Sequence, residues 1–357
     1  MASDVLPQHD SESTSLATKY QRSISWKLLL LSFLVLLVAG SFVFDVASGP
    51  AALSWLEVLN GLFQADAVEG AVRVIIWDVR LPQALLAVVV GACLGLAGAE
   101  MQTVLNNPLA SPFTLGIGAA ATLGASLVIV FQFSLFGLPS TIILPLAAFV
   151  MSALAALLIL FLSRHFGAAV HTVVLFGIAL LFGLNAIVGL LQFVADAEAV
   201  QQIVFWTMGS LARAGMAEVT LVAAVLLLAL PFSMRQSWAM TALLSGEEQA
   251  HSMGIKVSRL RLMVLMRVSV LTAAALAFVG EIGFIGLVAP HIARLLLGED
   301  HRFFLPGSAL AGALLLSLSS IASKMLIPGV LIPVGIITAL VGIPLFIALI
   351  IKRGRTL

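Results

Sequence analysis

The sequence has little charge and a single cysteine. Only 10% of its 357 residues are charged, whereas about 25% are charged in an average soluble domain, which excludes a water-soluble globular protein. One cysteine, Cys93, cannot build a disulfide framework or a cysteine metal cluster within one chain. The formal net charge is +1, and a near-neutral chain has no general electrostatic reason to bind nucleic acid.

The chain also lacks the motifs of common catalytic sites. It contains no Gly-x-x-x-x-Gly-Lys-Ser/Thr phosphate loop, so ATP hydrolysis by that route is excluded, and no His-Glu-x-x-His or Gly-x-Ser-x-Gly. No second His or Cys stands at ligand spacing from His291, so we expect this histidine to pack rather than bind metal. We expect no catalytic residue, no metal site, no cofactor and no enzymatic activity in this chain.

The sequence is rich in long runs of apolar residues. Of its residues 61% are hydrophobic, which is enough for about ten membrane spans of about 20 residues each. The apolar runs cover residues 28–44, 82–105, 113–134, 141–162, 172–194, 217–233, 262–280, 283–297, 304–323 and 333–351. The eighth run is short for a span. The sequence therefore predicts an all-α, polytopic membrane protein with about ten transmembrane helices.

The polar N-terminal segment differs from the rest of the chain. Residues 1–26 are rich in Ser and Thr and predict a disordered cytoplasmic tail, followed by one transmembrane domain over residues 27–357. A cleaved signal peptide is the alternative. The run 28–44 is longer than the 7–15 residues (roughly) of a signal-peptide core, which favours a retained first span.

The basic residues indicate the orientation. With a cytoplasmic N-terminus, only Arg73, Arg80, Arg213 and Lys324 of the 18 Lys and Arg fall outside. This asymmetry satisfies the positive-inside rule, and an even number of spans keeps the basic C-terminus inside as well. We expect both termini in the cytoplasm. The longer outer segments, 45–80 and 195–216, are candidates for short amphipathic helices at the membrane interface.

Two apolar runs are interrupted by helix-breaking residues. The first interruption contains Asn107, Pro108 and Pro112, and the second contains Gly283, Gly286 and Pro290. Backbone groups freed by such breaks cannot be satisfied by lipid and must face protein or a water-filled path. Breaks in corresponding positions of two halves are typical of transporters built from repeats. An ordinary cytoplasmic turn is the alternative for Asn107 and Pro108.

Few ionisable residues lie within the apolar runs. Only Glu100 and Glu281 are placed to couple transport to an ion gradient. We therefore expect another subunit to supply the energy. A stand-alone secondary transporter and an integral membrane enzyme remain the alternatives from other classes.

The longest inner connection, residues 235–261, has the composition of an exposed helix. Ser245 and Glu248 have the spacing of a capping box, and Gly254 stands where a helix ends. A short helix that faces the cytoplasm is a surface to which a partner protein can bind. Any solvated loop helix has the same composition.

In five motifs the chain resembles the permease subunits of the iron-siderophore and cobalamin (FecCD-type, type II) ABC importers. The motifs are Arg80-Leu81-Pro82, Asn107-Pro108-Leu109-Ala110-x-Pro112, Trp206-x-Met208-Gly209-Ser210-Leu211, Gly283-Phe284-Ile285-Gly286-Leu287-Val288-x-Pro290-His291-Ile292-x-Arg294, and Pro333-Val334-Gly335. Each is weak alone. Together and in order they cover nearly everything after residue 28.

The resemblance implies a permease for a ferric-siderophore-type complex in the inner or plasma membrane of a prokaryote, with cobalamin or haem as the alternative cargo. It implies a dimer with a second, identical or related permease subunit, two cytoplasmic ATP-binding subunits and an extracytoplasmic substrate-binding protein. It also assigns the coupling of ATP hydrolysis to one loop, which carries Ser245, Glu247, Glu248, Ala250 and Gly254.

On the outer face, the resemblance implies that basic residues hold carboxylates of the binding protein. Arg80 and Lys324 match such positions. The sequence departs from the pattern at Gln83, where many members have arginine, and at Leu331, where many have glutamate. Lysine keeps the charge at 324 but not the bidentate fork of an arginine.

Overall fold

The computed structural model describes residues 8–51, 53–63, 70–133, 139–165, 170–213 and 215–354, and within these ranges the chain has helices and no β-strand. The bundle of this described part consists of α1 (Gln8–Ala47), α4 (Leu81–Val104), α5 (Ile117–Phe131), α6 (Ser140–His165), α7 (Val170–Val194), α9 (Met216–Arg235), α12 (Val257–Val279), α13 (Ile285–Leu297), α14 (His301–Met325) and α15 (Val334–Gly354). Shorter elements connect them: α2 (Trp55–Phe63), α3 (Gly70–Val74), the π-helix η2 (Ile75–Arg80), the 3-10 helix η3 (Pro112–Leu115), α8 (Ala197–Thr207), α10 (Ser237–Leu243) and α11 (Glu247–Ser252).

Each of the ten apolar runs coincides with one helix of the bundle. Seven helices in the described ranges are long and apolar enough to cross a membrane, and α5, α13 and the apolar part of α15 (Val334–Ile347) are shorter. A multi-pass helical membrane fold is therefore confirmed. The number of complete crossings and the side on which the termini lie stay predictions.

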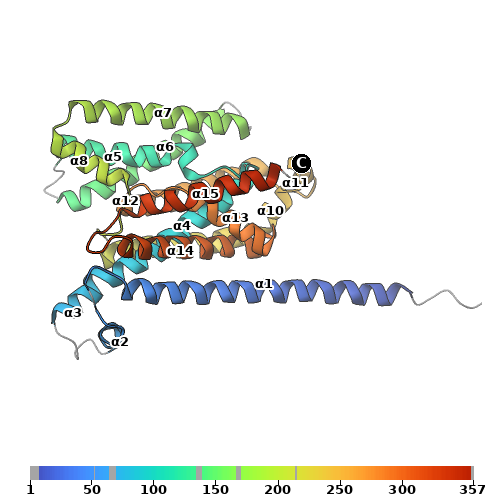
Figure 1. The fold of residues 1–357 in the computed structure, drawn as a ribbon. Helices are drawn as coiled ribbons and strands as arrows, with labels where there is room; N and C mark the ends of the chain where they lie inside the picture. Colours follow the sequence, from blue (N-terminus) through green and yellow to red (C-terminus); the bar gives the residue numbers. More distant parts are fainter. Residues whose placement is uncertain are drawn as a thin grey trace, which may run out of the picture.

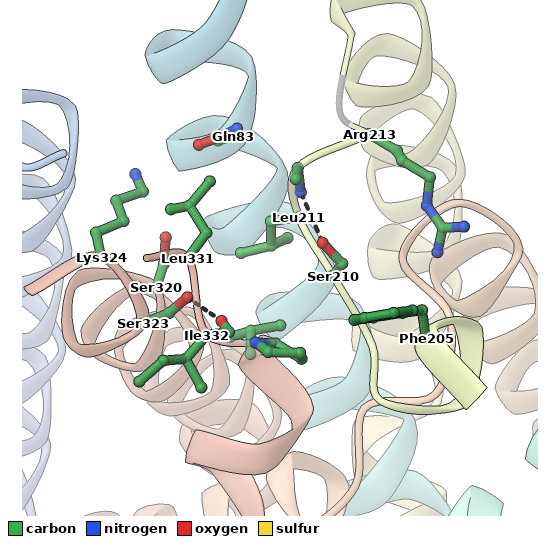
Figure 2. Close-up of a pocket in the computed structure, with 13 residues that line it drawn as sticks. Gln83, Phe205, Ser210, Leu211, Arg213, Ser320, Ser323, Lys324, Leu331 and Ile332 are labelled. Atoms are coloured by element: carbon green, nitrogen blue, oxygen red, sulfur yellow. Dashed lines mark hydrogen bonds between the residues drawn. The ribbon is translucent and has the colours of Figure 1, made fainter. Parts of the chain in front are cut away.

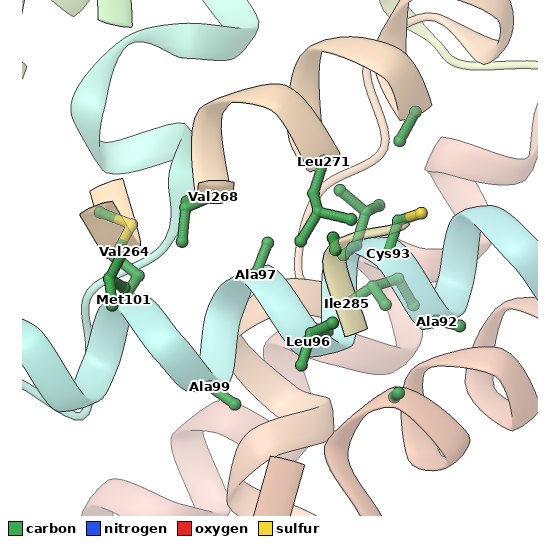
Figure 3. Packing of buried hydrophobic residues seen from close by; sticks show 14 of the residues in the cluster. Ala92, Cys93, Leu96, Ala97, Ala99, Met101, Val264, Val268, Leu271 and Ile285 are labelled. Carbon is green, nitrogen blue, oxygen red and sulfur yellow. The ribbon is translucent and has the colours of Figure 1, made fainter. Parts of the chain in front are cut away.

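The helices of the bundle run roughly parallel, with α4 in the middle (Figure 1). α12, α13 and α14 pack directly on α4, α5 and α6 lie on the α12 side, and α1 covers α14. The largest cluster of buried apolar residues is centred on α4 and α12, and Figure 3 shows Ala97 and Met101 of α4 pointing toward Val264 and Val268 of α12. The core of the protein is thus built around α4.

Small residues on α4 allow its neighbours to approach closely. A Cβ atom on Gly91 would overlap the carbonyl of Gly312 in α14, and a Cβ atom on Gly95 would overlap the carbonyl of Ser308. Stripes of small residues of this kind permit backbone contact between membrane helices, where packing rather than water exclusion drives association. α4 and α14 therefore form a tightly packed pair.

The N-terminal segment differs from its prediction. α1 begins at Gln8, so the structure places a helix over most of the segment for which a disordered tail is predicted. Residues 1–7 lie outside the described part. The physical reason is that extending an existing helix costs far less than nucleating one, so the span carries the helix into the polar sequence before it.

The connecting elements gather at the two ends of the bundle. α10 and α11 lie at the end where α15 finishes, whereas α2, α3 and α8 lie at the opposite end (Figure 1). We call these the inner end and the outer end. α8 is amphipathic, because Ala199, Ile203 and Trp206 are buried against the bundle whereas Glu198, Gln202 and Phe205 are exposed. This is the pattern predicted for a short amphipathic helix in segment 195–216, and its place at the membrane interface stays a prediction.

Candidate functional site

The first break follows directly on α4. Asn106 has a positive φ of 41°, and the amide of Asn107 donates to the carbonyl of Gln102 at 3.0 Å, which closes the C-terminal turn of α4. The side chain of Asn107 then accepts from the amide of Leu109 at 3.0 Å, across Pro108. Asn107 and Pro108 are half-buried at the inner end. These two residues therefore form an ordered turn, which was the alternative interpretation from the sequence.

The chain re-enters the protein after this turn. Ser111 and Pro112 are buried, and Ser111 with Thr114 forms a capping box at the start of η3. The freed backbone groups of this part of the break are thus satisfied within the protein, as the absence of hydrogen bonding from lipid requires.

The second break separates α12 from α13. Gly280 and Phe284 have positive φ angles of 76° and 66°, so the chain runs non-helically over residues 280–284. Gly283 is half-buried with open space where a Cβ atom would stand. Pro290 is buried inside α13. The positive φ angles of this break thus lie at Gly280 and Phe284 and not at Gly283, whereas Pro290 packs in the bundle.

The two breaks meet beside α4. A Cβ atom on Gly98 would overlap the carbonyl of Gly286, and a Cβ atom on Gly286 would lie 3.4 Å from Cδ of Pro112. Gly286 stands at the start of α13, and Pro112 stands at the start of η3. The structure thus brings the two predicted breaks into contact, although the sequence separates them by more than 170 residues.

Two further motif segments also converge on the chain at residues 279–281, where the second break begins. The amide of Ser210 donates to the carbonyl of Val279 at 2.7 Å. A Cβ atom on Gly209 would overlap the carbonyl of Glu281, and a Cβ atom on Gly335 would overlap the carbonyl of Met208. Glycines at these places let three backbones touch, which explains why the Trp206–Leu211 motif and the Pro333–Gly335 motif occur together.

Glu281 lies inside this junction. Its carboxylate is half-buried, and its hydrogen-bond partner is the hydroxyl of Thr122 in α5 at 3.5 Å. Glu100, the other carboxylate singled out from the sequence, is completely buried and receives three hydrogen bonds from Arg267 in α12, at 2.6 to 2.9 Å. Glu100 is therefore committed to an ion pair and is not free to carry an ion.

The inner connection folds into two short helices. α11 begins at Glu247 with Gly246 as its N-cap, so Ser245 does not cap it and the predicted capping box is wrong. Gly246 has a φ of 110°, which a serine cap does not adopt. Ser245 instead ends the turn after α10, where its amide donates to the carbonyl of Ala242 at 3.2 Å.

The end of α11 follows the prediction. Gly254 has a φ of 83°, its amide donates to His251 at 2.9 Å, and the amide of Ile255 donates to Ala250 at 3.0 Å. These two bonds form a Schellman motif with glycine in the left-handed position. Ala250 faces inward and is fully buried, whereas Glu248 is exposed. α11 therefore presents one outward face and packs with the other.

At the outer end, Arg80 and Lys324 have internal partners. Arg80 is 3% exposed, and its guanidinium donates to the carbonyls of Val46 and Ala47 at 3.3 and 2.8 Å, at the end of α1. The ammonium of Lys324 lies 2.7 Å from Oδ1 of Asp45, also in α1. Both side chains join α1 to the bundle. Docking of a partner by these two residues stays a prediction, and the structure does not expose their charged groups.

Two cavities open near these residues. A cavity of about 270 Å³ is lined by Gln83, Leu331, Arg213 and the chain around Ser210 and Ser323. Lys324 also lines this cavity, and beside it Ser323 donates to the carbonyl of Ile332 (Figure 2). A second cavity, of about 850 Å³, lies between the outer ends of α5, α6 and α9 and shares Arg213. The positions that depart from the family pattern, Gln83 and Leu331, thus line one outer cavity.

Two buried polar residues were missed from the sequence. Arg267 lies within the apolar run 262–280, where an arginine requires an acidic partner. That signal, together with Glu100, would have predicted the pair.

His301, the first residue of α14, is 1% exposed and lies between Thr103 and Thr241. Next to it, the hydrogen bond from Arg302 lowers the pKa of the Asp300 carboxyl. Nothing in the sequence signalled the contacts of His301.

Within the described ranges, no group of three His, Cys, Asp or Glu side chains is placed to hold a metal ion. The site described so far is therefore made of helix breaks, glycine contacts and buried ion pairs.

The comparisons with known proteins all identify transport proteins. The family model of the FecCD transport family matches residues 31–352. The chain is similar to the hemin transport system permease protein HmuU of Yersinia pestis, with 35% identity over 91% of this chain and 96% of HmuU. It is also similar to the ferric enterobactin transport system permease protein FepD of Escherichia coli, with 36% identity over 91% of this chain and 95% of FepD. Among solved structures, an inward-facing chain assigned as a metal-chelate type ABC transporter matches with a TM-score of 0.79 and 30% identity, over 90% of this chain and 99% of that one.

Proposed function

The chain belongs to the FecCD transport family of ABC importer permeases, and from this premise we propose that it carries a ferric-siderophore-type iron complex across the cytoplasmic membrane of a prokaryote. The two relatives above are named for hemin and for ferric enterobactin, which are both iron chelates. An iron chelate is therefore the cargo that these relatives favour. Haem or cobalamin is the alternative cargo.

The observation that carries the ATP-driven mechanism is the shape of α11. It is a short, capped helix at the inner end, with Ala250 buried on one face and Glu248 exposed on the other. We infer that a cytoplasmic ATP-binding subunit grips this outward face. In this proposal Ser245, Glu247, Glu248, Ala250 and Gly254 form the coupling loop. Closure of the ATP-binding pair then moves α11 relative to the membrane helices.

The outer end receives the cargo in this proposal. An extracytoplasmic binding protein delivers the chelate above the outer cavities, one of which has a volume of about 850 Å³. The breaks at Pro112 and Gly286 let the inner halves of the neighbouring helices shift without stretching continuous helices, so the path opens alternately to either side. Asn107, Pro108, Gly283 and Pro290 belong to the same two breaks.

A second permease subunit completes the path. The outward faces of α6, α7 and α9 expose large apolar side chains such as Leu157, Phe182 and Leu227. Lipid and a second subunit are the two apolar surroundings available to these faces within a membrane. We propose a dimer, of identical or sister subunits, with the path at its interface.

Reconstitution of the purified permease with its ATP-binding subunits and binding protein tests this function. We expect ATP-dependent uptake of radiolabelled ferric enterobactin into proteoliposomes, and weaker uptake of hemin and cobalamin. Uptake of cobalamin alone would move the chain to the alternative cargo. Uptake that a proton or sodium gradient drives without ATP would contradict the importer mechanism.

A further inference from the structure

The last turn of α4 carries three polar groups that contact other helices. They are the side chains of Glu100 and Thr103, which share a face at positions i and i+3, and the backbone carbonyl of Val104, which ends the helix. Each group contacts a side chain of another helix, and each of these side chains also contacts the segment 236–247 of the inner connection. We call the three links the inner-end bridges.

The first bridge passes through Arg267. Its Nε and Nη2 atoms donate to the carboxylate of Glu100 at 2.6 to 2.9 Å, and its Nη1 and Nη2 atoms donate to the side-chain carbonyl of Gln236 at 3.2 Å. Gln236 is the junction between α9 and α10. Glu100 is fully buried and Arg267 is 9% exposed, so the pair is shielded from water. A planar guanidinium held by several bonds fixes direction as well as distance.

The second bridge passes through His301. Its Nε2 atom lies 2.7 Å from the hydroxyl of Thr103, and its Nδ1 atom lies 3.1 Å from the hydroxyl of Thr241 in α10. The Thr103 hydroxyl also donates to the carbonyl of Ala99 at 2.9 Å, and the Thr241 hydroxyl to the carbonyl of Ser237 at 2.9 Å, so each hydroxyl contacts both the imidazole and its own helix, and the tautomer sets which ring nitrogen donates. The backbone amide of His301 also donates to Thr241 at 3.1 Å. The imidazole therefore joins α10 to α4 at a fixed spacing.

The third bridge passes through Arg261. Its Nε atom donates to the carbonyl of Val104 at 3.0 Å, and its Nη2 atom lies 2.6 Å from the carboxylate of Glu247. Val104 is the last residue of α4, and Glu247 is the first residue of α11. Arg261 thus satisfies a free carbonyl at the end of one helix and holds the start of the other.

We propose that the inner-end bridges transmit the movement of the coupling loop to α4, and that Arg261, Arg267 and His301 are the positioning residues that carry it. This proposal rests on the proposed function, since it requires a partner that pushes on α11. The outward face of α11 is exposed while its first residue is tied to Arg261, so a push reaches α4 through bonded atoms. α4 then moves Gly286 and Pro112, which pack against it at the two breaks.

The second bridge offers the mildest test, because Thr→Val substitution removes a hydroxyl and keeps the shape. We would reconstitute the complete importer with Thr103→Val, Thr241→Val and the double variant, and measure molecules of cargo taken up per ATP hydrolysed. The cargo is whichever of ferric enterobactin, hemin and cobalamin the wild-type complex takes up. Ser269→Ala and Ser308→Ala are matched controls, because each of these buried hydroxyls bonds only the preceding turn of its own helix, at 2.7 Å.

We expect each Thr→Val variant to lower the uptake per ATP by about fivefold, which is the effect of one lost hydrogen bond, and both controls to keep it. The double variant should be no worse than the worse single variant, because both hydroxyls act through one imidazole. Thr241→Ser restores the hydroxyl and should restore the ratio. Co-purification with the ATP-binding subunits should be unchanged, since the outward face of α11 is untouched.

Three results would overturn the proposal. The first is a ratio in both Thr→Val variants equal to that of the controls. The second is additive loss in the double variant, which would mean that the two hydroxyls act separately. The third is a ratio in Thr241→Ser as low as in Thr241→Val, which would make the valine effect one of packing. If uptake by the wild-type complex is driven by a proton or sodium gradient without ATP, the proposed function fails, and the bridges lose their role with it.

Discussion

Lys324 in α14 and Asp45 in α1 form a buried ion pair, with 2.7 Å between Nζ and Oδ1 and 4% and 0% exposure of the two side chains. Ser320 donates to the same carboxylate oxygen at 3.0 Å. The pair fastens the first membrane helix to the outer half of α14. Together with the bonds from Arg80 to the end of α1, it gives the outer basic residues a structural role within the chain.

Removing one partner of this pair should destabilise the protein. Lys324→Met leaves the carboxylate of Asp45 buried without its cation, and such a change costs about 3–5 kcal/mol. Lys324→Met with Asp45→Asn removes both charges and should recover most of the loss. Thermal unfolding of the protein in detergent measures both variants. Equal stability of Lys324→Met and wild type would contradict the structural role.

A variant of Arg80 distinguishes two roles of this residue: anchoring α1 to the bundle and docking the binding protein. Arg80→Gln should lower the melting temperature of the protein, because carbonyls at the end of α1 lose a buried donor, at about 1–3 kcal/mol. An affinity for the loaded binding protein that stays within a factor of about two would show that Arg80, a residue that is 3% exposed, anchors α1 and does not dock the partner. Surface plasmon resonance on the detergent-solubilised permease measures that affinity. A large loss of affinity at unchanged stability would instead support docking through Arg80.

The close approach of α4 and α13 gives a steric prediction. Gly98→Ala places a methyl group on the carbonyl of Gly286 and should destabilise the bundle by about 3 kcal/mol or more, since the contact is between two backbones. Gly183→Ala in α7 is the matched control, because it has open space around the added methyl group. The control should be neutral or stabilising by up to about 1 kcal/mol. Similar melting temperatures for the two variants would show that the contact is not as close as described.

The turn after α11 gives a prediction for coupling. Gly254→Val forces a β-branched residue into a left-handed conformation at a φ of 83°, which costs about 1–2 kcal/mol and loosens the coupling loop. Gly254→Asn should retain function, since asparagine adopts this conformation more readily. ATP hydrolysis stimulated by the loaded binding protein measures both variants. Full stimulation in Gly254→Val, with normal uptake, would count against the coupling role of this loop.

The orientation in the membrane can be tested by labelling. Cys93 is fully buried, so the wild-type protein should not react with a membrane-impermeant maleimide. Ala212→Cys, at the outer end, should react in sealed right-side-out vesicles, and Ser252→Cys on α11 should react only after permeabilisation. The reverse pattern would invert the predicted topology.

Much of the fold could be predicted from the sequence, because a membrane helix requires a long run of apolar residues that is visible in the sequence alone. The ten runs, the short eighth helix and the glycine that ends α11 all depend on local composition, and the five motifs predicted the family membership that the comparisons confirm. Ser245 failed as a cap because Gly246 takes that place with a φ of 110°. The sequence offers both residues, and only the backbone decides between them.

The ion pairs could not be predicted in the same way. Pairing Asp45 with Lys324, or Glu100 with Arg267, requires knowing which helices are neighbours and at what depth each residue lies. An amphipathic helix could be predicted in segment 195–216, but not that Trp206 of α8 packs in a cluster with α5, α6 and α12. Apolar length gives the number of helices, whereas contacts between helices set the site.

The central claim is that this permease moves its cargo with energy from ATP hydrolysed by partner subunits. The most direct measurement is uptake of radiolabelled ferric enterobactin into proteoliposomes that hold the complete importer, with ATP inside the lumen on the side of α11. We predict uptake that requires ATP and the binding protein, and that stops when the partner ATPase is inactivated. Uptake that persists with an inactive ATPase and follows an imposed proton or sodium gradient would contradict the account.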